Sequence, residues 1–545
     1  MKVIIMINNF NLKNKLLILL IIISSIYTAI LVHIQSIIGV SYWDIFVYLQ
    51  NSMLFAHINI GSQLNVPPVL SLLTSIPFRM GFISETTLFC VSGILFILLI
   101  VGIYLLFNEK FSPELSFIGS LFFSMLSLVV TWAVTGSNDI PSLTFSVWAL
   151  YFTIKGLNKS FNYYYLAFTC FLMAFFTRFT EGFILIVMIS YILMNKDKFK
   201  VQINKNDILK LFMFIVFLCA IIGGFYLYKQ HTIPFLSQFM EVSSSSQVSS
   251  VNIGYDLNPY YYIEYIPQLL TSTNVSLLYD KTLTTIYNTP TLLSYVILVL
   301  MCGGVILSFK GVYKKENIHN FSFILAVILG IITIITYLHV SYIFTEILFT
   351  ITLLLLYKSS LNKINQMDLL MILWMGIFII LHSYHPVKVD RYILPTFIPI
   401  TYFMINGIKN ITIKNKKTPL IILTILLVIL IPINYSYINS ITHPNPQSYE
   451  EKQAATWLEA YDNQLTNYNI SSDRGVAFSW YLKKYTYTTI PRVLEQNNET
   501  LENKLKTINA KYYIDATSNT TSIDGYHIIY TNNKEKYGIK IYQKD

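Results

Sequence analysis

The feature that most constrains this chain is a series of apolar runs between residues 15 and 434, most of them about as long as a bilayer is thick. A helix crosses the hydrocarbon core with about 20 apolar residues, at a rise of about 1.5 Å per residue. Charged residues make up only 12% of the 545 residues, which is about half their share in soluble proteins. The pattern predicts an α-helical polytopic membrane protein embedded in a lipid bilayer.

About thirteen spans fit this pattern, although several are short. The first is too long for the apolar core of a signal peptide, and no small-residue cleavage site follows it, so we expect it to be retained. The expected spans are residues 15–33, 86–107, 115–134, 140–154, 162–177, 182–194, 208–228, 290–309, 320–338, 342–357, 367–384, 392–408 and 418–434.

The distribution of Lys and Arg predicts how these spans are oriented. With a cytoplasmic N-terminus, the inner segments carry 20 basic residues and the outer loops before residue 435 carry 6. Cytoplasmic loops are the ones enriched in Lys and Arg, so we expect a multi-pass protein of the cell membrane with an extracytoplasmic C-terminal domain. The net charge of +10 falls mostly in short loops between spans, which argues against a nucleic-acid partner.

The sequence divides into two expected domains. Residues 1–437 form the transmembrane domain, with long outer loops at 34–85 and 229–288. The first loop is expected to contain a helix along the membrane interface, because Leu49, Met53, Leu54 and Ile58 have near-helical spacing.

The second outer loop and the tail have different compositions. The loop holds a serine run at 243–246 and tyrosines at 260–262, which are expected at headgroup level rather than on a sugar. Residues 441–545 resemble a small extracytoplasmic α/β domain. Its expected helices are 448–461, 476–483 and 499–508, and its expected strands are 511–515, 526–531 and 539–543.

The sequence indicates no metal and no required cofactor. All four cysteines lie within apolar runs, so neither a disulfide framework nor a zinc spacing is present. His382 and His385 have the i, i+3 spacing of two metal ligands, but a third ligand is not in view. We therefore interpret both histidines as residues of the membrane interface. A divalent metal is compatible with the sequence, but no motif indicates one.

Acidic residues gather on the expected outer face. Ten of them lie on the outer side before residue 435, in loops or near the outer ends of spans, against six on the inner side. Membrane orientation does not require this bias, because Asp and Glu contribute little to it. The carboxylates at the outer ends of the spans therefore predict a site.

The most informative segment is in the first outer loop. Asp44 is followed by Tyr48, by Pro67-Pro68 about twenty residues later, and by Gly81. This segment resembles the GT-C superfamily of membrane glycosyltransferases, and within it the branch of the protein O-mannosyltransferases and the lipid A aminoarabinose transferase. The frequent Asp-Glu pair of that branch is absent, because Ile45 follows Asp44.

Two further elements extend the resemblance over nearly the whole chain. Asn138-Asp139 opens the fourth span, where the family places its second acidic residue, and Asp390-Arg391-Tyr392-Ile-Leu-Pro395 matches an Arg-Tyr-apolar-Leu-Pro element. The resemblance implies transfer of a sugar from a polyprenyl-phosphate carrier, with mannose as the leading candidate. The acceptor would be a hydroxyl of a protein or a glycolipid on the outer face.

Such a transfer requires a base for the acceptor hydroxyl and cations for the leaving phosphate. Asp44 is the candidate base, and a single carboxylate suits an inverting displacement. A lipid-phosphate donor needs no nucleotide fold, and none of the usual nucleotide fingerprints appears. The remaining candidates, as substrate-binding residues, are Asp139, Tyr48, Arg178, Glu181, Lys388, Arg391 and Tyr392.

Each main candidate has a simpler alternative role. Asp44 and Asp139 could cap helices, and Pro141 is well placed in the first turn after Asp139. Arg391 could anchor its span at the interface. Arg178 and Glu181 are three residues apart and could pair with each other.

A transporter or flippase of lipid-linked saccharides is the alternative function. Transporters usually place polar residues in the middle of interrupted spans, whereas most charges here lie at span ends. A surface anchor would not need thirteen spans, and the Trp-Trp-Asp-Tyr-Gly signature of oligosaccharyltransferases is absent. The sequence favours the transferase.

Overall fold

The computed structural model describes residues 12–196, 199, 205–230, 258–273, 289–310, 321–359, 364–385, 388–411, 417–532, 534 and 537–545. The chain forms two compact units. The helical unit comprises Met1–Leu31, Gly93–Val134 and Asn138–Ile441, and the mixed unit comprises Val32–Ser92, Thr135–Ser137 and Thr442–Asp545. The first outer loop and the C-terminal tail therefore belong to the same unit.

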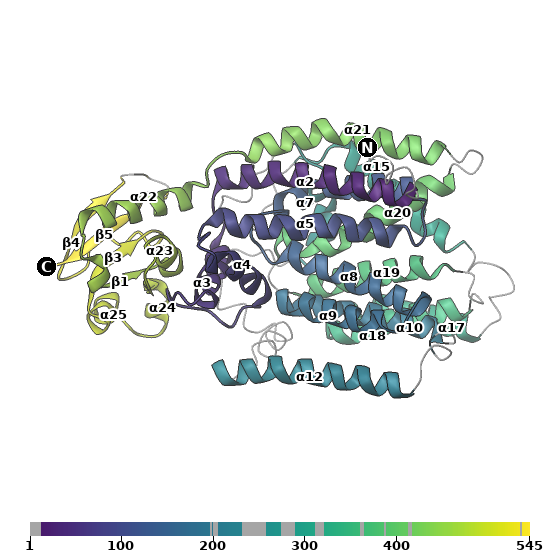
Figure 1. The fold of residues 1–545 in the computed structure, drawn as a ribbon, viewed down its shortest axis with the longest axis horizontal. Helices are drawn as coiled ribbons and strands as arrows, with labels where there is room; N and C mark the ends of the chain where they lie inside the picture. Colours follow the sequence, from purple (N-terminus) through teal and green to yellow (C-terminus); the bar gives the residue numbers. More distant parts are fainter. Residues whose placement is uncertain are drawn as a thin grey trace, which may run out of the picture. The chain divides into compact units, whose positions relative to one another are not determined.

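Apolar helices build the helical unit, and α2 and α5 also extend into the mixed unit by sequence (Figure 1). The elements are α2 (Leu12–Ile38), α5 (Glu85–Phe107), α6 (Pro113–Ser124), α7 (Ser127–Trp132), α8 (Asp139–Asn158), α9 (Tyr163–Thr177), η1 (Phe179–Phe183), α10 (Ile184–Met194), α12 (Lys205–Gln230), α14 (Tyr261–Leu270), α15 (Leu292–Ser308), α17 (Phe321–Thr336), α18 (Tyr342–Ser359), α19 (Gln366–Tyr384), η3 (Asp390–Thr396), α20 (Phe397–Ile411) and α21 (Thr418–Ile441).

Several of these helices have the length and composition of membrane spans. Within the described residues, five stretches qualify: Leu12–Ile38, Glu85–Phe107, Tyr342–Ser359, Gln366–Tyr384 and Thr418–Tyr461. Shorter apolar helices of 10–17 residues accompany them. The expected helical membrane architecture is confirmed, while the number of thirteen spans stays a prediction.

One expected span is not a single helix. Residues 115–134 form α6 and α7 instead, because the backbone of Leu126 is extended (φ −65°, ψ 138°). A break in a helix leaves carbonyls without their usual partners. The side-chain amide of Asn434 in α21 donates to the carbonyl of Met125 at 2.9 Å, which satisfies one of them at the break.

Close packing between helices holds the helical unit together. α8 and α9 lie side by side as a helical hairpin (Figure 1). α15 and α20 approach even more closely: a Cβ atom on Gly304 would lie 2.0 Å from the carbonyl oxygen of Phe403, and one on Gly407 would lie 2.2 Å from that of Leu300. Small residues permit such backbone contact between membrane helices.

The second outer loop is described only in part. The serine run at 243–246 lies outside the described residues. In α14 the side chains of Tyr261 and Tyr262 are buried, so the expectation that they lie at headgroup level is wrong. Only the neighbouring Tyr260, half exposed, suits that position.

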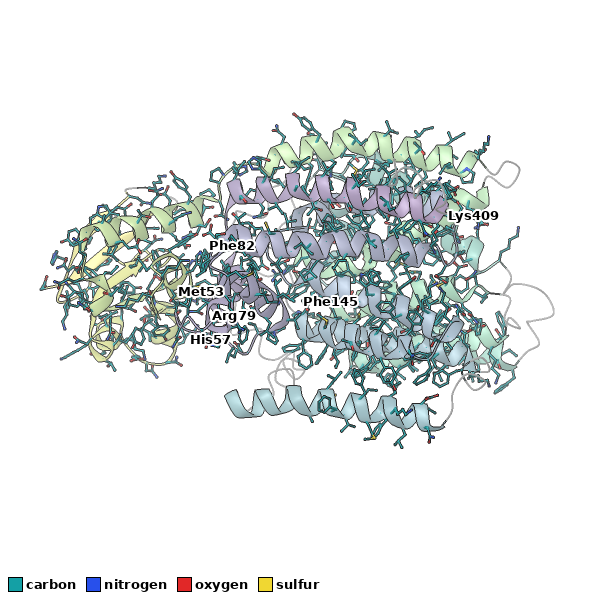
Figure 2. The ribbon with its side chains drawn as sticks, viewed as in Figure 1. Met53, His57, Arg79, Phe82, Phe145 and Lys409 are labelled. Atoms are coloured by element: carbon teal, nitrogen blue, oxygen red, sulfur yellow. The ribbon has the colours of Figure 1, made fainter. Side chains whose placement is uncertain are left out.

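The mixed unit contains two helices of the first outer loop, α3 (Trp43–Phe55) and α4 (Val69–Arg79). The helix expected around Leu49 and Met53 is confirmed, but both side chains are buried within protein. Figure 2 marks Arg79 at the end of α4, where its Nε donates to the carbonyl of Phe55 at 3.0 Å. This bond ties the end of α4 to the end of α3.

The tail folds into a five-stranded sheet with the strand order β2-β1-β3-β5-β4. β1, β2 and β3 are parallel, while β5 is antiparallel to both β3 and β4. The elements are α22 (Pro446–Tyr461), η4 (Leu465–Asn467), β1 (Asn469–Ser472), α23 (Gly475–Tyr481), β2 (Tyr487–Thr488), α24 (Pro491–Gln496), α25 (Leu501–Ile508), β3 (Ala510–Asp515), β4 (Tyr526–Thr531) and β5 (Lys540–Lys544).

The sheet separates two apolar cores, because successive residues of a strand face opposite sides. In β3, Tyr512 and Ile514 pack with residues of α22 and α23. Tyr513, between them, packs with residues of α24 and α25. The expected helices and strands of the tail are confirmed, whereas β1, β2 and α24 were not anticipated from the sequence.

Candidate functional site

A cluster of charged side chains forms in the helical unit where α8 begins. Asp139 is the first residue of α8 and only 4% exposed. Its Oδ1 lies 3.1 Å from Nη1 of Arg178, and its Oδ2 lies 3.7 Å from Nε of Arg391. One carboxylate therefore lies between two guanidinium groups.

Arg178 reaches Asp139 because α9 ends immediately before it. Its backbone is extended (φ −154°, ψ 118°), which turns the chain from α9 into η1. Nη1 of Arg178 also lies 4.0 Å from Oε1 of Glu181. The expected pair between these two residues is present but long, and the shorter contact is with Asp139.

Arg391 and Tyr392 enter the cluster from η3. The Arg391 guanidinium lies over the ring of Trp132 in α7, at 5.3 Å from its centroid. The ring of Tyr392 lies 4.7 Å from the Arg178 guanidinium and 5.8 Å from that of Arg391. Cation–π contacts of this kind hold a guanidinium in one plane, so the aromatic rings help to fix both cations.

Two further carboxylates border the cluster, in the short connections before α10 and α20. Glu181 is fully buried and accepts from the Ser146 hydroxyl at 2.8 Å, and burial raises its pKa to about 7. Asp390 accepts from the indole of Trp132 at 3.3 Å and from the backbone of Arg391 at 2.7 Å. Burial raises the pKa of Asp390 to about 6, so loss of water around both groups favours their neutral forms.

The cluster keeps hydrogen-bonding capacity for a ligand. Nη2 of Arg178 is buried and has no hydrogen-bond partner in the described part of the chain. A buried guanidinium donor without a partner is costly. An anionic group with several oxygens, such as a phosphate, would satisfy it.

Lys388 was also predicted to bind substrate, but its ammonium group bonds backbone carbonyls of the protein itself. Its Nζ donates to the carbonyls of His382, Ser383 and His385 at 2.9, 2.6 and 2.6 Å. An ammonium group has three hydrogens to donate, and these carbonyls lie at the end of α19. Lys388 thus caps α19, so we leave it out of the proposed substrate site.

Asp44 and Tyr48 belong to the mixed unit, not to the helical unit that holds the cluster. Asp44 lies in the first turn of α3. The guanidinium of Arg474, in the tail, lies 4.9 Å from the ring of Trp43 and forms an ion pair with the buried Glu451 at 2.6 Å. The tail therefore packs against the residue that precedes Asp44.

Comparisons with known proteins agree with this arrangement. The family described as dolichyl-phosphate-mannose-protein mannosyltransferase matches residues 65–223, and no curated protein matches the sequence. ArnT from Cupriavidus metallidurans in the apo state superposes with a TM-score of 0.55 at 11% identity, covering 96% of this chain and 97% of that chain. The chain has a GT-C membrane fold.

Two other solved structures share this GT-C fold. ArnT from the same organism, bound to undecaprenyl phosphate, gives a TM-score of 0.54 at 10% identity, covering 96% of this chain and 97% of that one. The apo oligosaccharyltransferase of Archaeoglobus fulgidus gives 0.50 at 11% identity, covering 91% of this chain and 69% of that one. The resemblance seen in the sequence motifs is thus confirmed at the level of the fold.

Within the GT-C fold, some residues around the cluster were not anticipated. Trp132 and Asp390 contact its members, and Tyr262 bonds the backbone of Val389, just before Asp390. Only Asp390 had a sequence signal, because it precedes Arg391. The paired histidines do not form a metal group: among the described residues, no set of three His, Cys, Asp or Glu could hold an ion. His382 instead lies 5.2 Å from the ring of Tyr392.

Proposed function

We propose that this protein is a membrane glycosyltransferase that moves a sugar from a polyprenyl-phosphate carrier to an acceptor hydroxyl. Mannose is the leading candidate sugar, because the mannosyltransferase family matches residues 65–223. ArnT, which has the same fold, is described in complex with undecaprenyl phosphate, and this supports a lipid-phosphate donor. The acceptor in this proposal is a protein or a glycolipid on the outer face of the cell membrane.

The observation that carries the proposal is the pair of guanidiniums around Asp139. Arg178 and Arg391 approach different oxygens of one carboxylate, at 3.1 and 3.7 Å. Each guanidinium has five N–H donors, and Nη2 of Arg178 has no hydrogen-bond partner among the described residues. Together they are suited to hold a phosphate whose negative charge grows as the sugar leaves.

The proposed reaction is a single inverting displacement. Asp44 removes the proton of the acceptor hydroxyl, and the acceptor oxygen forms a bond to the anomeric carbon of the sugar. The bond from that carbon to the phosphate oxygen breaks, and the polyprenyl phosphate leaves with the electron pair. Arg178 and Arg391 would stabilise this phosphate, and Asp44 would end the step protonated.

A donor assay tests the proposal. Purified protein is incubated with radiolabelled polyprenyl-phosphate sugars and an extract of envelope acceptors, and transferred label is measured. Asp44→Asn should lower turnover by about a hundredfold or more, the usual scale for loss of a general base. Asp524→Asn, at an exposed position of the tail, is the matched control and should transfer normally.

Two results would contradict the proposal. Near-normal transfer by Asp44→Asn would remove this carboxylate from the mechanism. Movement of the lipid-linked sugar across a vesicle membrane, with no transferred product from any donor, would instead favour the transporter or flippase.

A further inference from the structure

A second site lies at the other end of the helices that carry the Asp139 cluster. A pocket of about 540 Å³ is lined by residues at the C-terminal ends of α8, α10 and α18 and at the start of α19. α8 has Asp139 at its first residue and Asn158, in the pocket, at its last. These two residues are about 29 Å apart at a rise of 1.5 Å per residue, so the pocket is separate from the cluster.

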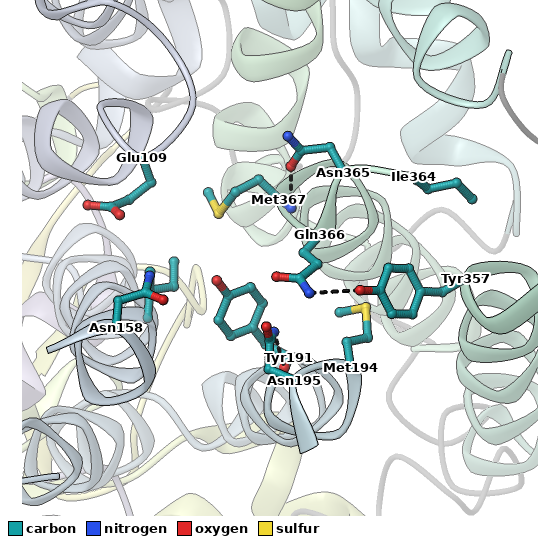
Figure 3. Close-up of a pocket in the computed structure, with 11 residues that line it drawn as sticks. Glu109, Asn158, Tyr191, Met194, Asn195, Tyr357, Ile364, Asn365, Gln366 and Met367 are labelled. Carbon is teal, nitrogen blue, oxygen red and sulfur yellow. Dashed lines mark hydrogen bonds between the residues drawn. The ribbon is translucent and has the colours of Figure 1, made fainter. Parts of the chain in front are cut away.

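Polar side chains dominate the rim and floor of this pocket. Figure 3 shows Tyr191 and Gln366 reaching into its centre, with Glu109 and Asn158 on one side and Tyr357 on the other. Tyr191, Asn195 and Tyr357 are each less than 8% exposed. The pocket therefore has a buried polar floor, and its volume is within the usual range of small-molecule sites.

The amide side chains are held in place and still have capacity for a ligand. Asn195 Nδ2 donates to the carbonyl of Tyr191 at 2.9 Å, which leaves its amide oxygen as an acceptor. Gln366 Nε2 donates to the hydroxyl of Tyr357 at 2.7 Å, which likewise leaves its oxygen. Asn365 uses its oxygen to cap α19, with a 2.8 Å bond from Met367, and keeps its NH₂ group. The pocket thus offers fixed donors and acceptors together.

The described lining residues favour a neutral ligand over an ionic one. Among the described residues that line the pocket, Glu109 alone has a charged side chain, and its carboxylate forms an ion pair of 2.5 Å with Lys155. An anion would meet this carboxylate and several amide oxygens, and a cation would find only a carboxylate that is already paired. Hydroxyl groups, which donate and accept at once, match such a mixture.

We propose that this pocket binds a neutral hexose. The amides would bond its hydroxyls, and the rings of Tyr191 and Tyr357 would pack on its apolar face, because tyrosine combines an apolar ring with a polar tip. The pocket lies at an end of apolar helices, so a glycolipid headgroup and a free sugar both fit this chemistry. This proposal does not depend on the transfer reaction proposed above.

Native mass spectrometry of the full-length protein tests the proposal. The protein is kept in a polyoxyethylene detergent, because maltoside and glucoside detergents would compete for the site. Monoglucosyl diacylglycerol is titrated against phosphatidylcholine and phosphatidylglycerol. We expect one glucosyl lipid to bind at a concentration at least about tenfold lower than either phospholipid. Equal retention of all three lipids would overturn the proposal, since no site would then select the hexose headgroup.

Variants locate the binding in the pocket. Tyr191→Phe combined with Gln366→Leu should weaken glucosyl-lipid binding about tenfold, the scale of one to two lost hydrogen bonds. Asn158→Ala, at the exposed rim, should weaken it less and cannot disturb the core. Tyr163→Phe, at the start of α9 and outside the pocket, is the matched control. Unchanged binding in both pocket variants would overturn the proposal.

A competition arm separates the two sources of the hexose. Millimolar methyl glucoside should displace the lipid if the ring alone is recognised, which supports the pocket as a sugar site. If the same concentration of methyl glucoside also displaces the lipid from the Tyr191→Phe/Gln366→Leu variant, the sugar binds elsewhere. That result would overturn the assignment of the pocket.

Discussion

Asp139 does not cap α8, since the N-cap is Asn138 and no side-chain cap bond forms there. It begins α8, but both of its oxygens face guanidinium groups from other elements. A buried carboxylate in contact with two guanidiniums helps to orient both of them. The alternative role of Asp139 as a helix cap is therefore wrong, and its contacts are with the two arginines.

A substitution at Arg391 separates phosphate contact from anchoring. Arg391→Lys keeps the charge but loses the planar fork that bonds two oxygens and stacks on Trp132. We expect turnover to fall about tenfold or more with little change in thermal stability, and Arg391→Ala to be worse. Turnover and the unfolding midpoint are measured on the same preparation.

The matched control is Arg79→Lys, because Arg79 is a surface-exposed arginine whose guanidinium bonds a backbone carbonyl instead. If Arg391→Lys retains full activity, the two-pronged contact is wrong and a point charge suffices. If Arg391→Ala is also fully active, the residue is only an anchor and the phosphate must be sought at Arg178.

At the scale of elements, α14 holds the segment that carries Arg391. The Tyr262 hydroxyl donates to the carbonyl of Val389 at 3.0 Å and accepts from its N–H at 3.1 Å. Tyr262 is fully buried. One side chain therefore satisfies both backbone groups of the residue just before η3.

Tyr262→Phe should leave these two backbone groups unsatisfied and loosen η3. Each buried group without a partner costs about 1–3 kcal/mol, so we expect lower stability and a raised KM for the donor lipid. In a Tyr262→Phe/Arg391→Lys double variant the losses in activity should be less than additive. Both substitutions would weaken the same contact, that of Arg391 with the donor phosphate. Tyr260→Phe, half exposed on the same loop, is the control. Additive losses would show that Tyr262 does not act through η3.

A second element-scale contact fixes the start of α3. Arg474 bonds Glu451 with two nitrogens, at 2.6 and 3.3 Å, and covers the ring of Trp43. Arg474→Gln should strongly destabilise the protein, by about 3–5 kcal/mol, because it leaves the buried Glu451 without its cation. Arg474→Gln/Glu451→Gln should recover part of this stability.

Thermal unfolding and transfer by the two Arg474 variants are compared. If the double variant regains stability but not transfer, the stacking on Trp43 positions Asp44. If it regains both, Arg474 only stabilises the mixed unit.

The sequence predicted these elements unevenly, for physical reasons. Arg391 and Asp139 could be recognised because each is part of a local motif at a span end. Trp132 and Tyr262 could not, since their partners are 258 and 127 residues away in the chain. The four residues of β1 were missed because their mostly polar sequence Asn-Ile-Ser-Ser shows no alternation, although the strand lies between β2 and β3 in the sheet and Ile470 packs in the apolar core.

For the whole molecule, the orientation in the membrane is the prediction with the widest consequences. The bias of 20 inner against 6 outer basic residues predicts that the C-terminal domain and the start of α8 lie on the outer face. Thiol labelling of intact cells checks it, using a variant in which Cys90, Cys170, Cys219 and Cys302 are replaced by Ala. The introduced cysteines must be at exposed positions, because a fully buried one such as Ser472 would be unreactive on either side.

Gln453→Cys on α22 and Ser160→Cys between α8 and α9 meet this requirement, since both positions are exposed. An impermeant maleimide should label Gln453→Cys in intact cells and should label Ser160→Cys only after the cells are opened. The reverse pattern would invert the orientation and place the Asp139 cluster on the cytoplasmic side. Labelling of both in intact cells would mean an even number of crossings between the two positions. The expected spans give nine crossings there, so that result would require one of the short helices not to cross.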